Sequence, residues 1–240
     1  MRGKVLFLIE LLVVATVFHL DYLGLLPVSK TPYLFLLGWI SLRLRGIRWK
    51  DVGLNLEGRA SSRPTRLDGA ERVPPLTRLL VVGLIVGIAM EALELFVTQP
   101  LLTKVIGRGA DLEQLRPLIG NWKLLIIGIV LSWTLAAFGE ETVYRGYLTN
   151  RVAGIFGESK AAWITAAILI TLLFGLAHFP QGPTGVIENV VDGAVLAALY
   201  FATGRNLWAP IIAHGIQDTV DVVLIYLGIY PGLSGSGMAA

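Results

Sequence analysis

The chain has 240 residues, of which 55% are hydrophobic and only 15% charged, with a mean hydropathy of +0.69 and a formal net charge of +3. This composition is far too apolar for a soluble domain of this size and indicates a polytopic membrane protein. Cysteine is absent, which excludes disulfides, a thiolate nucleophile and a cysteine-bound metal.

Apolar segments recur along the chain at close to the length that a membrane-spanning helix needs, about 20 residues for a hydrocarbon layer of about 30 Å. We therefore expect an all-α, polytopic integral membrane helical bundle of about seven transmembrane helices, within a range of six to eight. The expected spans are 5–26, 28–43, 77–98, 122–149, 159–178, 185–203 and 207–230. The first is predicted to be a retained helix and not a cleaved signal, because Glu10 interrupts it and no small-x-small cleavage site follows.

A basic stretch separates the second and third spans. From Arg43 to Arg78 the chain carries nine Lys or Arg against four acidic residues. The positive-inside rule places this stretch in the cytoplasm, and the amino terminus with it, so we expect a multi-pass protein of the cell membrane. The stretch lacks the interleaved aromatic residues of a nucleic-acid surface, and no nucleic-acid partner is expected.

The domain organisation follows from these features. Ser, Pro, Gly and charged residues concentrate in 57–75, as in a solvated linker. The expected parts are two N-terminal transmembrane helices (1–45), a cytoplasmic basic linker (46–76), a helical core (77–230) and a flexible C-terminal tail (231–240).

Two further patterns concern the helices of the core. Gly83-x-x-x-Gly87 is a small-x-x-x-small pattern, which predicts close packing of the third span against another helix. In 99–121 prolines and glycines argue against a continuous helix, namely Pro100, Gly107, Gly109, Pro117 and Gly120.

Three short polar clusters interrupt the apolar sequence of the core. They are Glu140-Glu141-x-x-x-Arg145, Phe174-x-x-x-His178 and His214-x-x-x-Asp218. Charged side chains in hydrocarbon cost at least a few kcal/mol, so such groups normally face a cavity and serve a pathway or a reaction. The alternative interpretation is that they are satisfied polar contacts that hold helices together.

The two adjacent glutamates have different neighbours on a helix. Glu141 is four residues from Arg145 and is predicted to form a structural ion pair with it. Glu140 is then left as the reactive carboxylate, in the role of a general base. The clusters reach a similar depth only if the fourth span continues to about residue 156, at about 1.5 Å per residue.

The last span carries a second set of polar residues on one stripe. His214, Asp218 and Asp221 are separated by +4 and +7 steps, which return to nearly the same helix face. Asp218 is predicted to orient the His214 ring and to fix its tautomer.

The three clusters, in this order and at these separations, resemble the CPBP family, the CAAX-protease and bacteriocin-processing intramembrane endopeptidases related to the type II CAAX prenyl proteases. The run Leu199–His214 and the stretch Trp49–Leu54 also resemble that family, and the resemblance covers roughly 47–225. It implies a helical fold with a cavity that opens to the cytoplasmic side, and hydrolysis of a peptide bond near a hydrophobic or lipid-modified carboxyl terminus.

The resemblance also implies roles for individual residues. Glu140 would activate the attacking water, while His178 and His214 would bind that water or stabilise the tetrahedral oxyanion. Asp218 stands where the family often has Asn, and an ionised carboxylate only accepts hydrogen bonds, so the position favours orienting His214 or binding a metal. Zn²⁺ is a candidate cofactor, with Glu140, His178 and His214 as its ligands, and a metal-free glutamate mechanism is the open alternative.

Other acidic residues lie at helical spacing inside apolar sequence. Glu188 and Asp192 share one face of the sixth span, where they could line a substrate path or carry protons. Asp221 and Phe174 are further candidates for lining the cavity. Glu91 and Glu94 on the third span have the same character, and the sequence leaves open whether they are functional.

The sequence therefore favours an intramembrane endopeptidase that hydrolyses a hydrophobic or lipid-modified peptide or protein in the lipid membrane. The first alternative is a proton- or ion-coupled transporter whose acids form a relay, although no repeat between halves is visible. The second is a non-catalytic immunity or scaffold protein on the same fold, because fold does not determine function.

Overall fold

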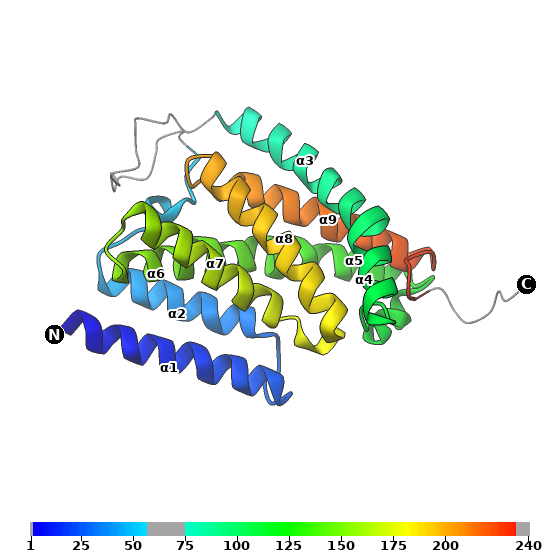
Figure 1. The fold of residues 1–240 in the computed structure, drawn as a ribbon, viewed down its shortest axis with the longest axis horizontal. Helices are drawn as coiled ribbons and strands as arrows, with labels where there is room; N and C mark the ends of the chain where they lie inside the picture. Colours follow the sequence, from blue (N-terminus) through cyan, green and yellow to red (C-terminus); the bar gives the residue numbers. More distant parts are fainter. Residues whose placement is uncertain (1, 57–74, 234–240) are drawn as a thin grey trace, which may run out of the picture.

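The computed structural model describes residues 2–56 and 75–233, and every regular element within these ranges is a helix. The expected all-α membrane bundle is confirmed. Most of the predicted linker, 57–74, and the end of the predicted tail, 234–240, lie outside the described residues. Figure 1 shows a bundle with α1 and α2 along one side and α3 along the opposite side.

Within 2–56 and 75–233 the α-helices form seven rods, a term used here for a continuous helical stretch. Several of these rods contain shorter elements joined end to end. Their bounds are α1 Arg2–Tyr22, α2 Lys30–Leu44, η1 Trp49–Val52, α3 Leu76–Leu93, η2 Glu94–Thr98, α4 Gln99–Ile106, η3 Glu113–Leu118, α5 Trp122–Leu131, η4 Ser132–Glu140, η5 Thr142–Thr149, α6 Asn150–Ile155, α7 Lys160–Leu176, η6 Phe179–Gln181, α8 Gly182–Ala202 and α9 Trp208–Tyr226. Here η1, η3 and η6 are 3₁₀ helices, while η2, η4 and η5 are π-helical.

Three helical stretches among the described residues are long and apolar enough to cross a membrane: Leu76–Ile106, Trp122–Ile155 and Phe179–Ala202. Large aliphatic side chains project from the outside of the bundle, and Ile88 and Ile168 are each 55% exposed. An apolar exterior of this extent belongs in contact with lipid.

The longest stretch, Trp122–Ile155, carries the first polar cluster. It begins where the Asn121 side chain accepts hydrogen bonds from the Lys123 and Leu124 backbone amides, an N-cap. It then continues through η4 and η5 to Ile155. The helix thus extends past the predicted end of this span at residue 149 and nearly to residue 156, which is the condition under which the first two clusters share one depth.

The third span is longer than predicted. The helix does not end at residue 98 but continues to Ile106, so the predicted end of this span was wrong. The prediction that 99–121 is not one continuous helix is confirmed, because α4 ends at Ile106, with Gly107 as its C-cap. Proline breaks a helix by removing a hydrogen bond and by clashing with the carbonyl one turn earlier. Here the π-helical turn η2 immediately precedes it, and Pro100 lies in the first turn of α4, where proline is tolerated.

The most extensive helix pair is α3 with α9. A Cβ atom on Gly83 would lie 2.7 Å from the Ala209 carbonyl oxygen, and one on Gly87 would lie 2.5 Å from that of Ala213. The glycines thus let two backbones touch, which confirms the packing role predicted for the Gly83-x-x-x-Gly87 pattern. This contact fixes the height of α9, the helix that carries His214.

The two N-terminal helices pack against the core. α1 contacts α2, and α2 contacts η4 and η5. Buried Glu10 of α1 joins these layers, because it pairs with Arg45 after α2 and, at 2.6 Å, with Arg151 on α6. Of these two helices, α2 reaches the cavity of the core, which its Thr31 lines.

Candidate active site

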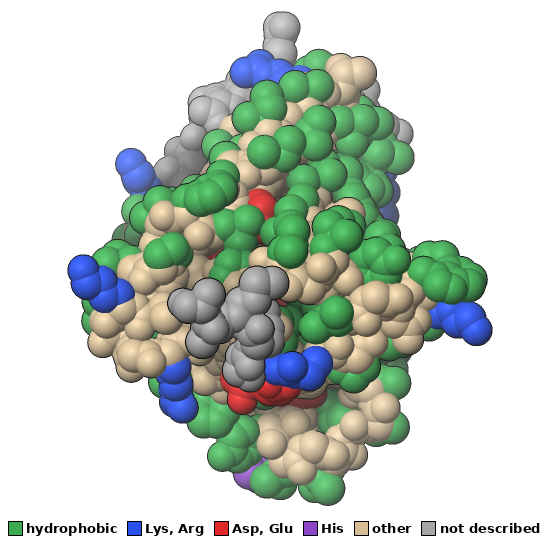
Figure 2. Space-filling model, turned by 90° about the vertical axis from the view of Figure 1, so that its right-hand side faces the viewer, with side chains coloured by type: hydrophobic (Ala, Val, Ile, Leu, Met, Phe, Trp, Pro, Cys, Tyr) green, Lys and Arg blue, Asp and Glu red, His purple; other side chains and the backbone are tan. Residues whose placement is uncertain are grey.

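One cavity of about 550 Å³ opens in the core and receives residues from all three polar clusters. Glu140, Phe174, His178, His214 and Asp218 all line it. Figure 2 shows the end of the molecule at which α4 and the end of α9 lie, with acidic atoms visible between hydrophobic side chains. The cavity thus brings ionisable groups together inside an apolar bundle.

Glu140 lies at the last position of the π-helical segment η4 and faces the cavity. Its Oε1 accepts a hydrogen bond of 3.4 Å from the hydroxyl of Thr31, a buried residue of α2. With this single long contact, Glu140 keeps oxygen lone pairs available to a molecule in the cavity.

Glu141 is oriented away from the cavity lining and is fully buried. Arg145 donates to its Oε1 at 2.8 Å and also donates to the Gly193 carbonyl oxygen on α8 at 2.9 Å. The predicted Glu141–Arg145 ion pair is present, and it also ties the long helix to α8. Neighbouring glutamates thus have separate surroundings.

Phe174 is the apolar centre of the site. The Arg145 guanidinium lies 4.5 Å from the centroid of its ring, and the His178 and His214 rings lie at 5.0 and 6.1 Å. Such contacts of a ring with a cation and with other rings favour defined orientations. Phe174 therefore positions the charged pair and both imidazoles at once.

His178 follows the end of α7, where the chain turns into η6. Its Nδ1 lies 2.9 Å from the Phe174 carbonyl oxygen. Because a carbonyl only accepts, Nδ1 carries the hydrogen, and the neutral ring presents a free Nε2 lone pair. His178 can therefore accept a hydrogen bond from a water in the cavity.

His214 is held between two carboxylates. Its Nδ1 lies 3.0 Å from Glu141 Oε1, and its Nε2 lies 3.4 Å from Asp218 Oδ1. An imidazole with an acceptor on each side is suited to the doubly protonated form, in which both nitrogens donate. Asp218 lies beside the His214 ring, as its predicted role of orienting that ring requires. The sequence did not predict the second contact, between His214 and Glu141.

The donor arrangement does not fit a zinc ion held by Glu140, His178 and His214. Tetrahedral zinc needs ligand nitrogens at about 2.0–2.1 Å from the metal, whereas both ring nitrogens of His214 face carboxylates. Among the described residues, these three do not bring their ligand atoms within 4.8 Å of one another. No step through a metal is therefore derived for this site.

The other acids named from the sequence fall into two groups. Glu188 and Asp192 on α8, together with Glu94 and Asp221, line the same cavity. Glu91 does not line the cavity but lies beside Glu94 and Asp221.

Sequence reasoning missed several polar contributors to the cavity wall, among them Thr31 and Ser132. Thr31 belongs to an N-terminal helix that the sequence assigned to a separate part of the chain. Ser132 begins the π-helical segment η4. Neither carries a signal that distinguishes it from the many other hydroxyl residues of a membrane helix.

Comparison with known proteins yields one match. Residues 121–220 match the family model described as "Type II CAAX prenyl endopeptidase Rce1-like". No curated protein and no solved structure matches the chain. The matched segment contains Glu140, His178, His214 and Asp218, and this similarity supports the resemblance to the CAAX protease family that the three motifs indicated.

Proposed function

We propose that this protein is an intramembrane endopeptidase in which Glu140 activates the attacking water. One observation carries the proposal: Glu140, His178 and His214, from three different helical rods, line a single cavity within a membrane bundle. The family match over 121–220 supports peptidase chemistry in general, and the residue roles below rest on the geometry.

In the proposed reaction, Glu140 takes a proton from water while the water oxygen attacks the carbonyl carbon of the scissile bond. The free Nε2 of His178 accepts the second hydrogen of that water and so fixes its orientation. The proton on Glu140 then passes to the leaving amine as the carbon–nitrogen bond breaks. General base catalysis of this kind contributes about 10²–10⁴ in rate.

His214 supplies positive charge beside the reaction. Clamped by Glu141 and Asp218, its ring cannot rotate away. Asp218 is part-exposed at 23%, so its contact with Nε2 can open toward the substrate oxygen. A preorganised donor stabilises charge that develops only in the transition state.

The cavity suits an apolar substrate. Its volume of about 550 Å³ is within the usual range for organic ligands, and Leu131, Leu135, Leu196 and Ile225 contribute apolar lining. We propose a hydrophobic or lipid-modified peptide or protein as substrate, reached from the membrane lipid. The proposed topology is multi-pass with a cytoplasmic amino terminus, from the basic residues after α2.

A second candidate function is a proton- or cation-coupled transporter. The observation in its favour is that six carboxylates line the one cavity: Glu94, Glu140, Glu188, Asp192, Asp218 and Asp221. Intramembrane acids of this density are typical of proton relays. The two functions predict different activities of the purified protein: cleavage of peptides for the endopeptidase, and proton-driven uptake into vesicles for the transporter.

The deciding experiment presents purified protein in lipid nanodiscs with a mixed library of hydrophobic and prenylated peptides. Wild type is expected to cleave some of them, while Glu140→Gln and His178→Ala are expected to lose at least about 10² in rate. Thr16→Ala, on the outer face of α1, is the control. Cleavage that survives Glu140→Gln would overturn the mechanism, and proton-driven uptake by vesicles without cleavage would favour the transporter.

A further inference from the structure

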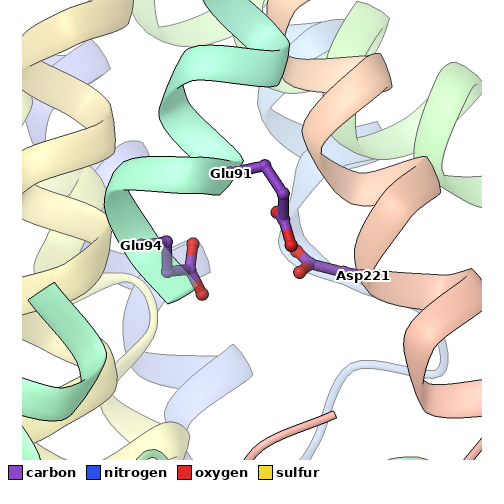
Figure 3. Close-up of side chains that lie close together, drawn as sticks. All are labelled: Glu91, Glu94 and Asp221. Atoms are coloured by element: carbon purple, nitrogen blue, oxygen red, sulfur yellow. The ribbon is translucent and has the colours of Figure 1, made fainter. Parts of the chain in front are cut away.

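Three acidic side chains from two helical rods meet beside the cavity. Glu91 lies on α3, Glu94 begins η2, and Asp221 lies on α9. One carboxylate oxygen from each comes within 4.8 Å of the other two. Figure 3 shows Glu91 and Asp221 pointing at each other, with Glu94 on the next turn of the same rod.

Glu91 has no hydrogen-bond donor to balance its charge. It is only 5% exposed, and neither of its carboxylate oxygens has a partner. Asp221 Oδ1 is also buried without a partner. Two carboxylates that face each other in apolar surroundings repel strongly unless they share a proton or bind a cation between them.

Glu94 is held in place by neutral donors. Gln217 donates to its Oε2 at 2.8 Å, and the Tyr230 hydroxyl donates to its Oε1 at 2.7 Å. Hydrogen bonds of this kind fix the orientation of a carboxylate. Each oxygen retains a lone pair that can bind a further partner.

The His214 imidazole of the cavity lining is already paired with Glu141 and Asp218, so it does not balance the charge of this cluster. Six acidic residues line the cavity, whereas no Lys or Arg is among the lining residues that the structure describes. This concentration of carboxyl groups favours the binding of a cation or of protons at this end of the bundle.

We propose that Glu91, Glu94 and Asp221 form a binding site for a hard divalent cation of the size of Ca²⁺, apart from the residues proposed to activate water. An all-oxygen donor set selects hard cations over zinc or copper. The three oxygens lie within 4.8 Å of one another, so they can contact one ion. Mg²⁺ demands near-ideal octahedral geometry and is usually held by one or two carboxylates, whereas a set of three carboxylates suits the more flexible coordination of Ca²⁺.

Such an ion links α3 to α9 on the C-terminal side of the contact that Gly83 and Gly87 make with α9. Asp221 lies one turn beyond Asp218 on α9, and Asp218 contacts His214. The cation thus holds the helix that carries half of the proposed catalytic residues. It acts through helix position and not on the substrate.

The test is equilibrium dialysis of the full-length protein in nanodiscs with radiolabelled Ca²⁺ in the presence of excess Mg²⁺. Wild type is expected to bind one Ca²⁺ per chain, and Ca²⁺ is expected to raise the Tm. Glu91→Gln and Asp221→Asn are expected to bind at least about tenfold more weakly and to lose the Tm rise. Because each variant removes a repulsive charge, its Tm without Ca²⁺ should equal or exceed that of wild type, which verifies folding.

Glu140→Gln is the matched control, since it makes the same change in a carboxylate of the same cavity outside the cluster. It is expected to retain Ca²⁺ binding even where cleavage is lost. Ca²⁺ binding therefore tests the cation site, and cleavage tests the proposed peptidase function, so that either proposal can be refuted without the other. Absence of Ca²⁺ binding by wild type would overturn the proposal. So would unchanged binding by Glu91→Gln and Asp221→Asn, or equal loss in Glu140→Gln.

Discussion

Replacing Arg145 by leucine tests the buried ion pair that underlies the site. Arg145 and Glu141 have side chains only 2% and 0% exposed, so the substitution leaves a buried carboxylate with His214 as its remaining partner. Removing one partner of a buried pair costs about 3–5 kcal/mol. Because His214 still donates to Glu141, we expect the lower end, about 3 kcal/mol, which includes the lost bond to the Gly193 carbonyl.

The assay is thermal unfolding in nanodiscs, followed by tryptophan fluorescence. For a chain of this length 1 kcal/mol corresponds to about 2–4 °C in Tm, so Arg145→Leu should lower the Tm by about 6–12 °C. Arg116→Leu is the control, because its pair with Glu113 is exposed to solvent and contributes little to stability. The double variant with Glu141→Leu should recover part of the loss. Equal effects of Arg145→Leu and Arg116→Leu would refute the reasoning.

Three further outcomes follow from the geometry. Gly87→Ala should lower the free energy of unfolding by about 1–3 kcal/mol through its clash with α9. Gly109→Ala is the control and should cost under about 0.5 kcal/mol, because its new Cβ has no neighbour closer than 3.6 Å. Similar losses of unfolding free energy in the two variants would exclude the close contact of α3 with α9. Asp218→Asn should retain cleavage within about tenfold, because an amide still contacts His214, while Asp218→Leu should lose it; equal rates would remove Asp218 from the site. A transition-metal chelator that spares Ca²⁺ should leave the cleavage rate unchanged, and a loss restored by zinc would contradict the metal-free mechanism.

Much of this architecture is predictable from local sequence. Hydropathy locates the spans because each helix must satisfy its own backbone in lipid. The +4 spacing predicts the Glu141–Arg145 pair because it lies within one helix. The depth argument from rise per residue correctly required a helix reaching about residue 156.

Contacts between helices were not predictable in the same way. The approach of Glu91 and Glu94 to Asp221 depends on the pairing of α3 with α9, which the Gly83-x-x-x-Gly87 pattern suggests without naming the partner helix. The hydrogen bond from Thr31 to Glu140 depends on α2 joining the core.

The π-helical turns were also missed, and they explain a specific error. The general rule that proline breaks a helix predicts that the helix ends before Pro100. The π-helical turn η2 instead changes the backbone hydrogen-bond pattern just before Pro100, and the helix continues. In η4 and η5 the i→i+5 pattern likewise changes which side chains share a face. The division between cavity-facing Glu140 and buried Glu141 arises at the junction of these two segments.

That division gives the most direct test of the proposed mechanism. Glu140→Gln and Glu141→Gln are isosteric changes at adjacent positions, to be compared by kcat for a cleaved peptide and by Tm. We expect Glu140→Gln to lose at least about 10² in kcat with little change in Tm, and Glu141→Gln to lower the Tm by removing the buried negative charge that Arg145 and His214 share. Cleavage at the wild-type rate by Glu140→Gln would contradict the central claim.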